Sequence, residues 1–394
     1  MIFMPSFFSK FHNYLTRFIP IIDKWLIGQL IPPLIFSISA FTVVSLSVGV
    51  IFDLIRKIVE FGLPFSFALK ILFLKLPGFL VLSFPMSVLL STLLTYGKLS
   101  ANSELMALKS IGVKPVRFIV PALIVSIFMT GLTFFFNNTL VPYSNRIAEV
   151  SMRDGLGKST IIERGNDVFF PGYGSIIDPK TNQPSKKNTY LTQIFFSRVV
   201  ENKTMKNVTL LDFSRLGNKQ ILSAETGTFD NEESGWIFRD GKLVIFSDNE
   251  QISIVDFDEY FYPLGDGPLE VSEIAKDAND MSVGEAIAAQ NIYEKSGNIK
   301  EARKMKVRIQ EKFTLPCACI VFGLIGSTLG SKPNLRSSKS QGFGLSVILI
   351  LIYYVMSFLF SSFGVIGIMA PSFAAWSPII ISMFGGILLL KRAY

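Results

Sequence analysis

Apolar residues run along this chain in long stretches that contain no Asp, Glu, Lys or Arg. The five stretches are Trp25–Phe52, Leu76–Gly97, Phe118–Asn145, Phe313–Ser331 and Ser340–Leu390. A helix needs about 20 apolar residues to cross the hydrocarbon core of a bilayer, so each of the first four stretches holds one span. The last stretch is long enough for two spans, with a turn at Gly364–Pro371 between them. The pattern predicts six transmembrane helices, three before and three after a polar middle segment.

In that middle segment the pattern changes to short β-branched and aromatic runs separated by Gly, Asn, Asp and Pro. Six runs are typical of strands: Val168–Phe170, Tyr190–Phe196, Val208–Phe213, Gln220–Ala224, Gly235–Phe238 and Lys242–Phe246. Turn residues recur about every ten positions, which favours an all-β sandwich or an open barrel. Ser234-Gly235 and Asp240-Gly241 are turn signals within this segment.

A helical connector is expected to follow the strands from about Pro268 onward. Ser282 with Glu285 three residues later is a capping-box pattern, which predicts a helix through about Glu294. A second, highly charged helix from about Asn298 is expected to run directly into the fourth span. The strand segment is therefore joined to the membrane at both of its ends.

The N-terminal residues 5–25 place apolar side chains at roughly helical spacing, interspersed with Lys10, Arg17 and Lys24. This mixture predicts an amphipathic helix lying in the membrane interface and leading into the first span. It argues against a cleaved signal peptide, which has a continuous apolar centre.

The loop between the second and third spans contains a second amphipathic segment, residues 100–112. The Ser and Asn residues before Glu104 can cap a helix start, and Glu104 stands in the first turn, where the helix dipole favours an anion. Gly112 and then Pro115 end the helix. Its apolar face is formed by Leu105, Leu108 and Ile111. This segment is either a helical turn resting on the bilayer surface or a coupling helix that docks into a cytoplasmic motor protein.

The charges of the chain divide by position and indicate its orientation. The formal net charge is +8, but residues 146–312 carry 22 Lys/Arg and 26 Asp/Glu, leaving 16 Lys/Arg and 4 Asp/Glu for the membrane-embedded remainder. A nucleic-acid-binding protein would instead show a basic patch on a soluble domain. Lys and Arg gather in the N-terminal segment, in the loops after the second and fourth spans, and at the C-terminus. Because cytoplasmic loops are enriched in Lys and Arg, both termini are expected in the cytoplasm and the strand segment on the opposite side.

The sequence offers little catalytic chemistry. Gly157-Lys158-Ser159-Thr160 resembles the end of a phosphate-binding loop, but the glycine that this motif requires five residues before Gly157 is replaced by Met152. Cys317 and Cys319 are two residues apart in the fourth span and do not share a helix face, which argues against a disulfide or metal site. We therefore expect no enzyme activity, cofactor or metal in this chain, and any ATP hydrolysis in a partner.

Several segments in order resemble the lipopolysaccharide-export permease family (LptF/LptG). They are Lys75-Leu76-Pro77-Gly78, Phe84-Pro85-Met86-Ser87, the loop Leu99 to Gly112 with its Ser-Glu-Leu core, Val141-Pro142, Ser223-Ala224-Glu225-Thr226-Gly227, Gly235-Trp236, Leu315-Pro316, Gly342-Phe343-Gly344, Tyr353-Tyr354, Pro371 and Ala375-Trp376. The resemblance covers nearly the whole chain. It implies an α-helical membrane protein of 3 + 3 spans with an inserted extracytoplasmic β-jellyroll-like domain.

The resemblance also implies a function and partners. Two such permease subunits pair in the inner membrane, driven by a dimer of a separate cytoplasmic ATP-binding protein. They extract lipopolysaccharide and pass it to periplasmic jellyroll proteins. The family's coupling-helix acid falls on Glu104, with Ser103, Leu105 and Leu108 beside it. The alternatives are a membrane-anchored scaffold for periplasmic partners and an ABC permease for another lipid or a lipoprotein.

The substrate side is predicted from residue type alone. Arg56, Lys57, Lys70 and Lys75 follow the first span or precede the second, where they either bind the lipid headgroup or snorkel to the membrane surface. Candidate acyl-chain contacts are Phe41, Phe52, Phe195, Ile245 and Phe358. For the phenylalanines of the spans, helix packing or contact with bilayer lipid is at least as good an interpretation. For Phe195 and Ile245 on the strands, the alternative is an ordinary closed core. Alternating apolar residues on the strands predict an apolar trough in the β-domain that is open at one end.

Together these patterns predict five regions along the chain. They are the amphipathic helix at 1–27, the first three spans with the coupling helix at 28–145, the β-domain at 146–268, the helical connector at 269–312 and the last three spans at 313–394.

Overall fold

The computed structural model describes residues 20–114, 116–156, 168–174, 190–201, 204–215, 218–230, 234–247, 252–264, 268, 280–332 and 339–393. The chain divides into two compact units. One unit comprises Met1–Leu156 with Ile309–Tyr394, and the other comprises Gly157–Arg308. We call them the membrane unit and the β unit and describe each by itself.

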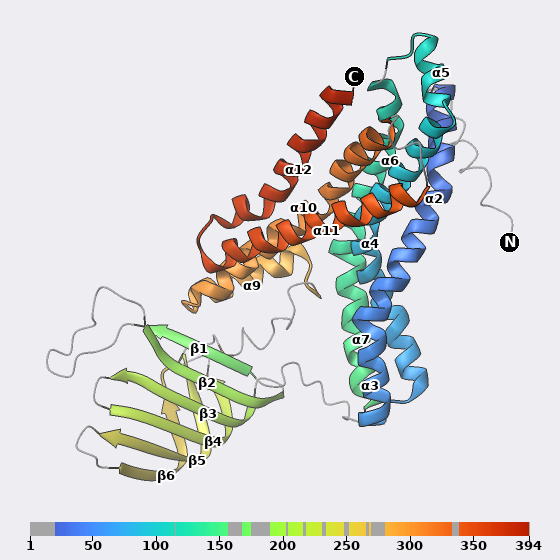
Figure 1. The fold of residues 1–394 in the computed structure, drawn as a ribbon. Helices are drawn as coiled ribbons and strands as arrows, with labels where there is room; N and C mark the ends of the chain where they lie inside the picture. The colour runs from blue at the N-terminus through green and yellow to red at the C-terminus, as the bar shows by residue number, and fades with distance from the viewer. Residues whose placement is uncertain are drawn as a thin grey trace, which may run out of the picture. The chain divides into compact units, whose positions relative to one another are not determined.

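In the described residues of the membrane unit, all regular secondary structure is helical (Figure 1). Before the strands come α2 (Ile21–Leu46), η1 (Ser47–Ile51), α3 (Phe52–Phe61), α4 (Phe65–Ala101), α5 (Glu104–Ser110), α6 (Val116–Phe135), η2 (Phe136–Leu140) and α7 (Val141–Gly155). After them come α10 (Ile299–Gly330), α11 (Lys339–Ile366) and α12 (Pro371–Ala393). Within the described part of the chain, 6 helices are long and apolar enough to cross a membrane. In chain order, three of these precede the strands and three follow them, which agrees with the six apolar helices that the sequence predicts.

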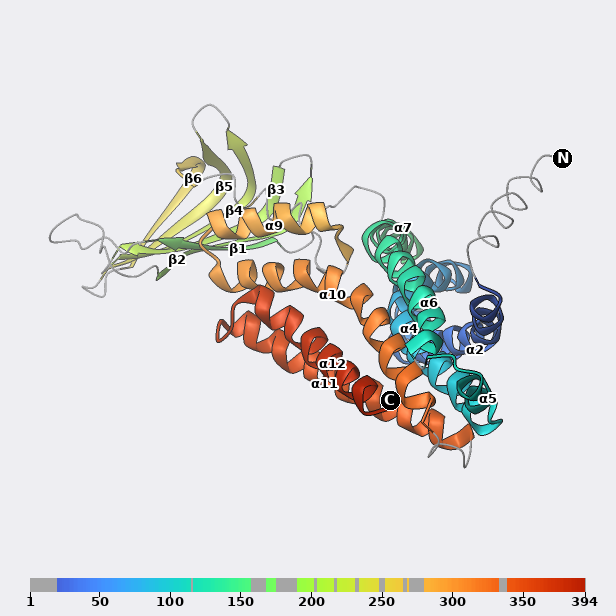
Figure 2. The same cartoon turned by 90° about the horizontal axis from the view of Figure 1, so that it is seen from above.

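Two of the spans continue well past their apolar stretches. The first runs without a break over Ile21–Phe61 and the third over Val116–Met152, each through a single π-helical turn. The first ends at Gly62, whose φ of 70° lies in the left-handed region that glycine adopts readily. Between α11 and α12 the chain turns at Gly367, with a φ of 93°, before Pro371 begins the last helix (Figure 2).

Helix α10 packs closely against α4 because it presents glycine at the contacts. A Cβ atom added to Gly326 would lie 2.1 Å from Thr92 Oγ1 and 2.9 Å from the Leu89 carbonyl oxygen. One added to Gly330 would lie 3.1 Å from the backbone nitrogen of Gly97. Larger side chains have no room here. Small residues of this kind allow helix backbones to approach each other in a membrane, where no hydrophobic effect drives helices together.

The β unit contains one antiparallel sheet in which every strand pairs with its neighbour in the chain (Figure 1). Its strands are β1 (Val168–Gly174), β2 (Tyr190–Glu201), β3 (Thr204–Arg215), β4 (Asn218–Asp230), β5 (Gly235–Ser247) and β6 (Ile252–Tyr262). Two sequence expectations are corrected. Asp240-Gly241 is not a turn, because β5 continues through it, and β6 was not predicted at all.

Strand β5 continues through Asp240-Gly241 because the sheet bends at a row of residues that includes Asp240. Asn207, Glu225, Asp240 and Asp258 occupy corresponding positions on β3 to β6, and the pairing continues in the same register on both sides of them. Asn207 and Asp240 have φ values of 52° and 55°, a left-handed conformation that Asn and Asp tolerate better than most residues. We call these four residues the bend row.

The side chains change faces at the bend row. On β5, the even-numbered residues Trp236 and Phe238 are buried before the row, whereas the odd-numbered Leu243 is buried after it. The alternation of inward and outward side chains is therefore shifted by one residue. The register meanwhile stays constant, so the backbone itself must bend. Gly241, which directly follows the row on β5, fits only as glycine, because a Cβ there would lie 2.5 Å from the Ser223 carbonyl oxygen.

The bend brings non-adjacent strands together around one core. The ring of Phe195 on β2 lies 5.1 Å from that of Trp236 on β5, measured between centroids, and both side chains are fully buried. The Tyr262 hydroxyl on β6 donates to Asp212 Oδ2 on β3 at 2.5 Å and accepts from Gln193 Nε2 on β2 at 2.8 Å. Burial, reinforced by Asp212, raises the pKa of Tyr262 well above its ordinary value, so the phenol remains a donor.

The helical connector agrees with its sequence pattern. Helix α9 (Val283–Lys295) begins with a capping box in which Ser282 and Glu285 exchange side-chain and backbone hydrogen bonds. Helix α10 then begins at Ile299 and is continuous to Gly330, so the charged helix does run into the fourth span.

Candidate functional site

The loop between the second and third spans contains α5, which is shorter than the 100–112 segment that the sequence indicated. Ser100 and Ala101 complete α4 instead. Ser103 is the N-cap of α5 but has a φ of 60° and makes no side-chain capping hydrogen bond, so the expected Ser cap is absent. Asn102 Nδ2 donates to Glu104 Oε1 at 2.9 Å and holds that carboxylate close to its own helix.

The C-terminal end of α5 is well defined. Gly112 has a φ of 88°, its N–H donates to the Lys109 carbonyl at 3.0 Å, and the Val113 N–H donates to the Leu108 carbonyl at 3.2 Å. This is a Schellman motif, in which a left-handed glycine satisfies the last carbonyls of a helix. The stop signal at Gly112 is therefore confirmed.

One face of α5 packs into the membrane unit. Leu105 is 3% exposed and belongs to a buried cluster with Leu26 and Leu30 of α2 and with residues of α4 and α6. The members from those two helices are Tyr96, Leu99, Phe118 and Ala122. Leu108 packs against the same cluster. Leu105 is thus an anchor of α5 in this structure.

The other face of α5 is open. Met106 is 49% exposed and Ile111 is 75% exposed, whereas Glu104 is partly buried at the start of the helix. The sequence placed Ile111 on the same face as Leu105, but Ile111 lies at the C-cap, where helical spacing no longer applies. Met106 was missed, although its position one residue from the buried Leu105 could have indicated an outward side chain. Contact with an ATPase through Ser103, Glu104, Leu105 and Leu108 stays a prediction.

Polar contacts join the helices that surround this anchor. The Tyr96 hydroxyl on α4 donates to the Phe118 carbonyl on α6, and Thr95 Oγ1 donates to the Gln29 carbonyl on α2 at 3.4 Å. Arg117 Nη2 on α6 lies 2.5 Å from Asp23 Oδ2 on α2. Figure 1 shows α5 at the end of the membrane unit where α2 begins. The helices α2, α4 and α6, which surround Leu105 of α5, are therefore joined to one another by side-chain hydrogen bonds and an ion pair.

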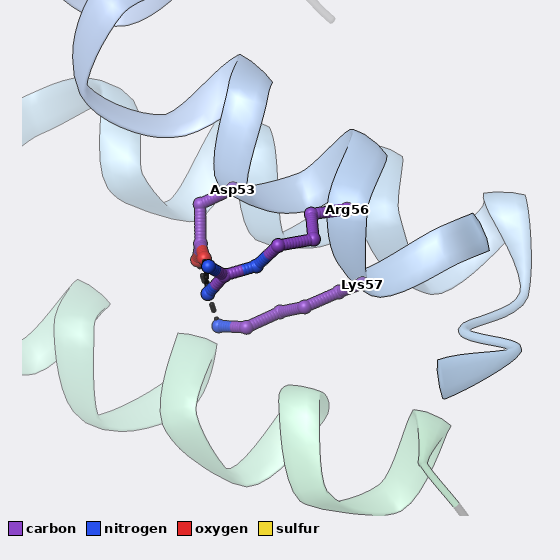
Figure 3. A network of polar contacts seen from close by, with 3 residues as sticks. All are labelled: Asp53, Arg56 and Lys57. Carbon is purple, nitrogen blue, oxygen red and sulfur yellow. Dashed lines mark hydrogen bonds and ion pairs between the residues drawn. The ribbon is translucent and has the colours of Figure 1, made fainter. Parts of the chain in front are cut away.

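Of the predicted headgroup residues, Arg56 and Lys57 lie on α3 at the far end of the first span, and Lys70 and Lys75 lie on α4. Arg56 and Lys57 both contact Asp53, with nitrogen-to-oxygen distances of 3.2 Å and 2.8 Å (Figure 3). Lys70 is exposed and Lys75 is partly buried on α4. In the described part of the chain, no ion pair is formed by either of these two lysines. The structure does not bring the four basic residues into one cluster of contacts.

The predicted acyl-chain residues fall into two environments. Phe52 and Phe358 are 70% and 72% exposed on the membrane unit, and Phe41 packs against a buried cluster of that unit. Phe195 is fully buried in the sheet, and Ile245 packs at the edge of the same core. A lipid role for these residues stays a prediction. In the isolated subunit, the side chains of Phe52 and Phe358 are accessible, whereas that of Phe195 is buried.

Comparisons with known proteins identify the family. Residues 24–392, nearly the whole chain, match the family described as lipopolysaccharide export system permease LptF/LptG. The chain belongs to the LptF/LptG permease family. It is also similar to Uncharacterized protein RP871 of Rickettsia prowazekii (strain Madrid E), with 22% identity over 310 residues that cover 75% of this chain and 80% of that protein.

Family membership and the six apolar helices together make this chain a multi-pass protein of the inner membrane and, at the level of the family, a lipopolysaccharide-export permease. The resemblance inferred from the sequence motifs is thereby confirmed.

Proposed function

We propose that this LptF/LptG chain is one permease subunit of an ABC-type exporter. It pairs with a second, homologous permease subunit, either identical or different, and is driven by a dimer of a separate cytoplasmic ATP-binding protein. It extracts lipopolysaccharide or a related glycolipid from the inner membrane and delivers it to periplasmic jellyroll proteins through its own β unit.

The observation that carries the proposal is the two-sided character of α5. Its Leu105 face is anchored among the first three spans, while Met106 and Ile111 are presented outward next to Glu104. A helix that is fixed to the spans on one side and exposed on the other can receive a moving partner. The carboxylate of Glu104 adds a charge that a basic groove would recognise.

The orientation follows from the basic loops. Lys98, Lys109, Lys114 and Arg117 surround α5, which favours a cytoplasmic position for this end. The β unit then lies in the periplasm, where we expect its apolar core to open at one end and accept acyl chains. Membership in a permease family supports transport over the scaffold alternative.

The test uses Glu104→Ala in the complex purified from membranes, with Glu60→Ala on α3 as a matched acidic control. We expect the Glu104→Ala chain to insert normally but to lose most of the co-purifying ATPase and to abolish export. The control should retain both. Normal export by Glu104→Lys, which reverses the charge, would contradict the proposal, and so would a purified complex that contains no ATPase.

A further inference from the structure

Among the described residues, the ion pair between Asp23 and Arg117 stands out because its carboxylate is buried and because it joins two spans. The Asp23 side chain is 4% exposed and that of Arg117 is 35% exposed. Asp23 uses one carboxylate oxygen for the pair, and the other, Oδ1, is buried and has no hydrogen-bond partner among the described residues. A buried carboxylate depends on its partner for compensation, so removing Arg117 would leave a charge that water cannot reach.

The pair flanks the anchor of α5. Asp23 follows Ile22, and Arg117 precedes Phe118, and both of these apolar residues belong to or pack against the cluster around Leu105. The hydroxyl of Tyr96 on α4 donates to the carbonyl of the same Phe118. The two charged residues therefore fix the relative position of α2 and α6 where these helices enclose Leu105.

Helix α5 has little structure of its own with which to hold an orientation. It contains 7 residues and has no side-chain cap at its start. Isolated helices shorter than about 12 residues are marginal in water, so such a helix takes its direction from what it packs against. The orientation of α5 is determined by Leu105 and Leu108, and the site into which these two side chains pack is formed by α2, α4 and α6.

We propose that Asp23 and Arg117 are positioning residues. They keep α2 and α6 at the distance at which Leu105 packs between them, and the movement of α5 is thereby transmitted to the first and third spans. The inference rests on the proposed function and deepens it. Glu104 makes contact with the motor, whereas the buried pair determines how much of the motor's movement reaches the spans.

The test compares three changes in the complete complex reconstituted in liposomes that contain lipopolysaccharide. Asp23→Asn keeps the shape of the side chain and removes its charge. The double change Asp23→Arg with Arg117→Asp exchanges the charges. Asp53→Asn, at the exposed pair in α3, is the control. The measurements are ATPase co-purification, ATP hydrolysis and the amount of glycolipid delivered per ATP hydrolysed.

With Asp23→Asn we expect the ATPase to remain bound and ATP hydrolysis to continue, while glycolipid delivered per ATP falls at least fivefold, the lower end of the range of about 5- to 150-fold typical of coupling between sites. The charge exchange should restore a large part of that ratio, which a loss of folding would not allow. Unchanged delivery per ATP in Asp23→Asn would overturn the inference.

If Asp23→Asn fails to insert, Arg117→Gln replaces it, since glutamine removes the charge with which Asp23 pairs. An unchanged ratio with that variant would likewise overturn the inference. The proposed function fails separately, through retention of the ATPase and export by the Glu104 variants.

Discussion

The two ends of the first span contain similar ion pairs in different surroundings. Near α5, Asp23 pairs with Arg117 of another helix, and the carboxylate is almost fully buried. At the far end, Asp53 pairs with Arg56 and Lys57 of its own helix, with its side chain 42% exposed. About 30 residues, or about 45 Å of helix, separate the two aspartates.

The difference shows that burial and helix membership, and not the charges themselves, decide what an ion pair does. An exposed pair within one helix contributes little, because water solvates both partners when they separate. A buried pair between helices is often no more stabilising in total, yet losing one partner is costly because the other is left in a medium that cannot solvate it. The pair at Asp23 therefore joins two spans, whereas the pairs at Asp53 join residues of one helix only.

The substitution with the largest expected effect on the difference between the two ends is Arg117→Ala. We expect the membrane unit to lose about 3–5 kcal/mol of stability, because Asp23 becomes an uncompensated buried charge. The measurement is the thermal unfolding midpoint of the purified protein in detergent. Replacing both residues together, Asp23→Leu with Arg117→Leu, should recover much of the loss. A double variant as unstable as Arg117→Ala would show that shape, and not charge, is responsible.

A smaller effect is expected when the basic residues at the far end are neutralised in pairs. If Arg56 and Lys57 bind a lipid phosphate, replacing both with Gln should weaken glycolipid binding by about 1.5–3 kcal/mol, the usual contribution of a hydrogen bond to a charged group. Glycolipid-stimulated ATP hydrolysis in reconstituted membranes is the readout.

The corresponding pair Lys70→Gln with Lys75→Gln provides the comparison, since neither lysine is held by Asp53. Wild-type stimulation and lipid affinity in both double variants would leave all four residues as anchors at the membrane surface.

The smallest effect is expected for Asp53→Asn, which removes the carboxylate shared by Arg56 and Lys57. Stability should change by less than about 1 kcal/mol, and that change should shrink further at high salt, as it does for exposed pairs. Thermal unfolding at low and high salt measures it. A loss comparable with that of Arg117→Ala would contradict the distinction between the two ends.

The sequence predicted the spans well because an apolar stretch of about 20 residues without charge is rare outside membrane-spanning helices. It predicted most strands, but it divided β5 at Asp240-Gly241, since a left-handed Asp before Gly is also what a turn requires. The strand β6 was missed, although Ile252, Ile254 and Val255 carry the β-branched signal of a strand. Both errors have local causes.

The arrangement around α5 could be predicted only in part. Glu104 and the stop at Gly112 are local features and were visible. The pairing of Asp23 with Arg117 joins residues that are 94 positions apart, and nothing in either neighbourhood indicates the partner. Which face of α5 is buried likewise depends on Leu26, Tyr96 and Phe118, which come from three different helices.

The bend row also limits how the β unit can change during evolution. Because four neighbouring strands switch faces at the same row, inserting or deleting one residue in any single strand would put its inward and outward positions out of phase with its neighbours on one side of the bend. Length changes between relatives should therefore gather in the connections between strands. In an alignment of such relatives, an Asn, Asp or Gly at the positions of Asn207 and Asp240 would mark the bend even where the surrounding residues have diverged.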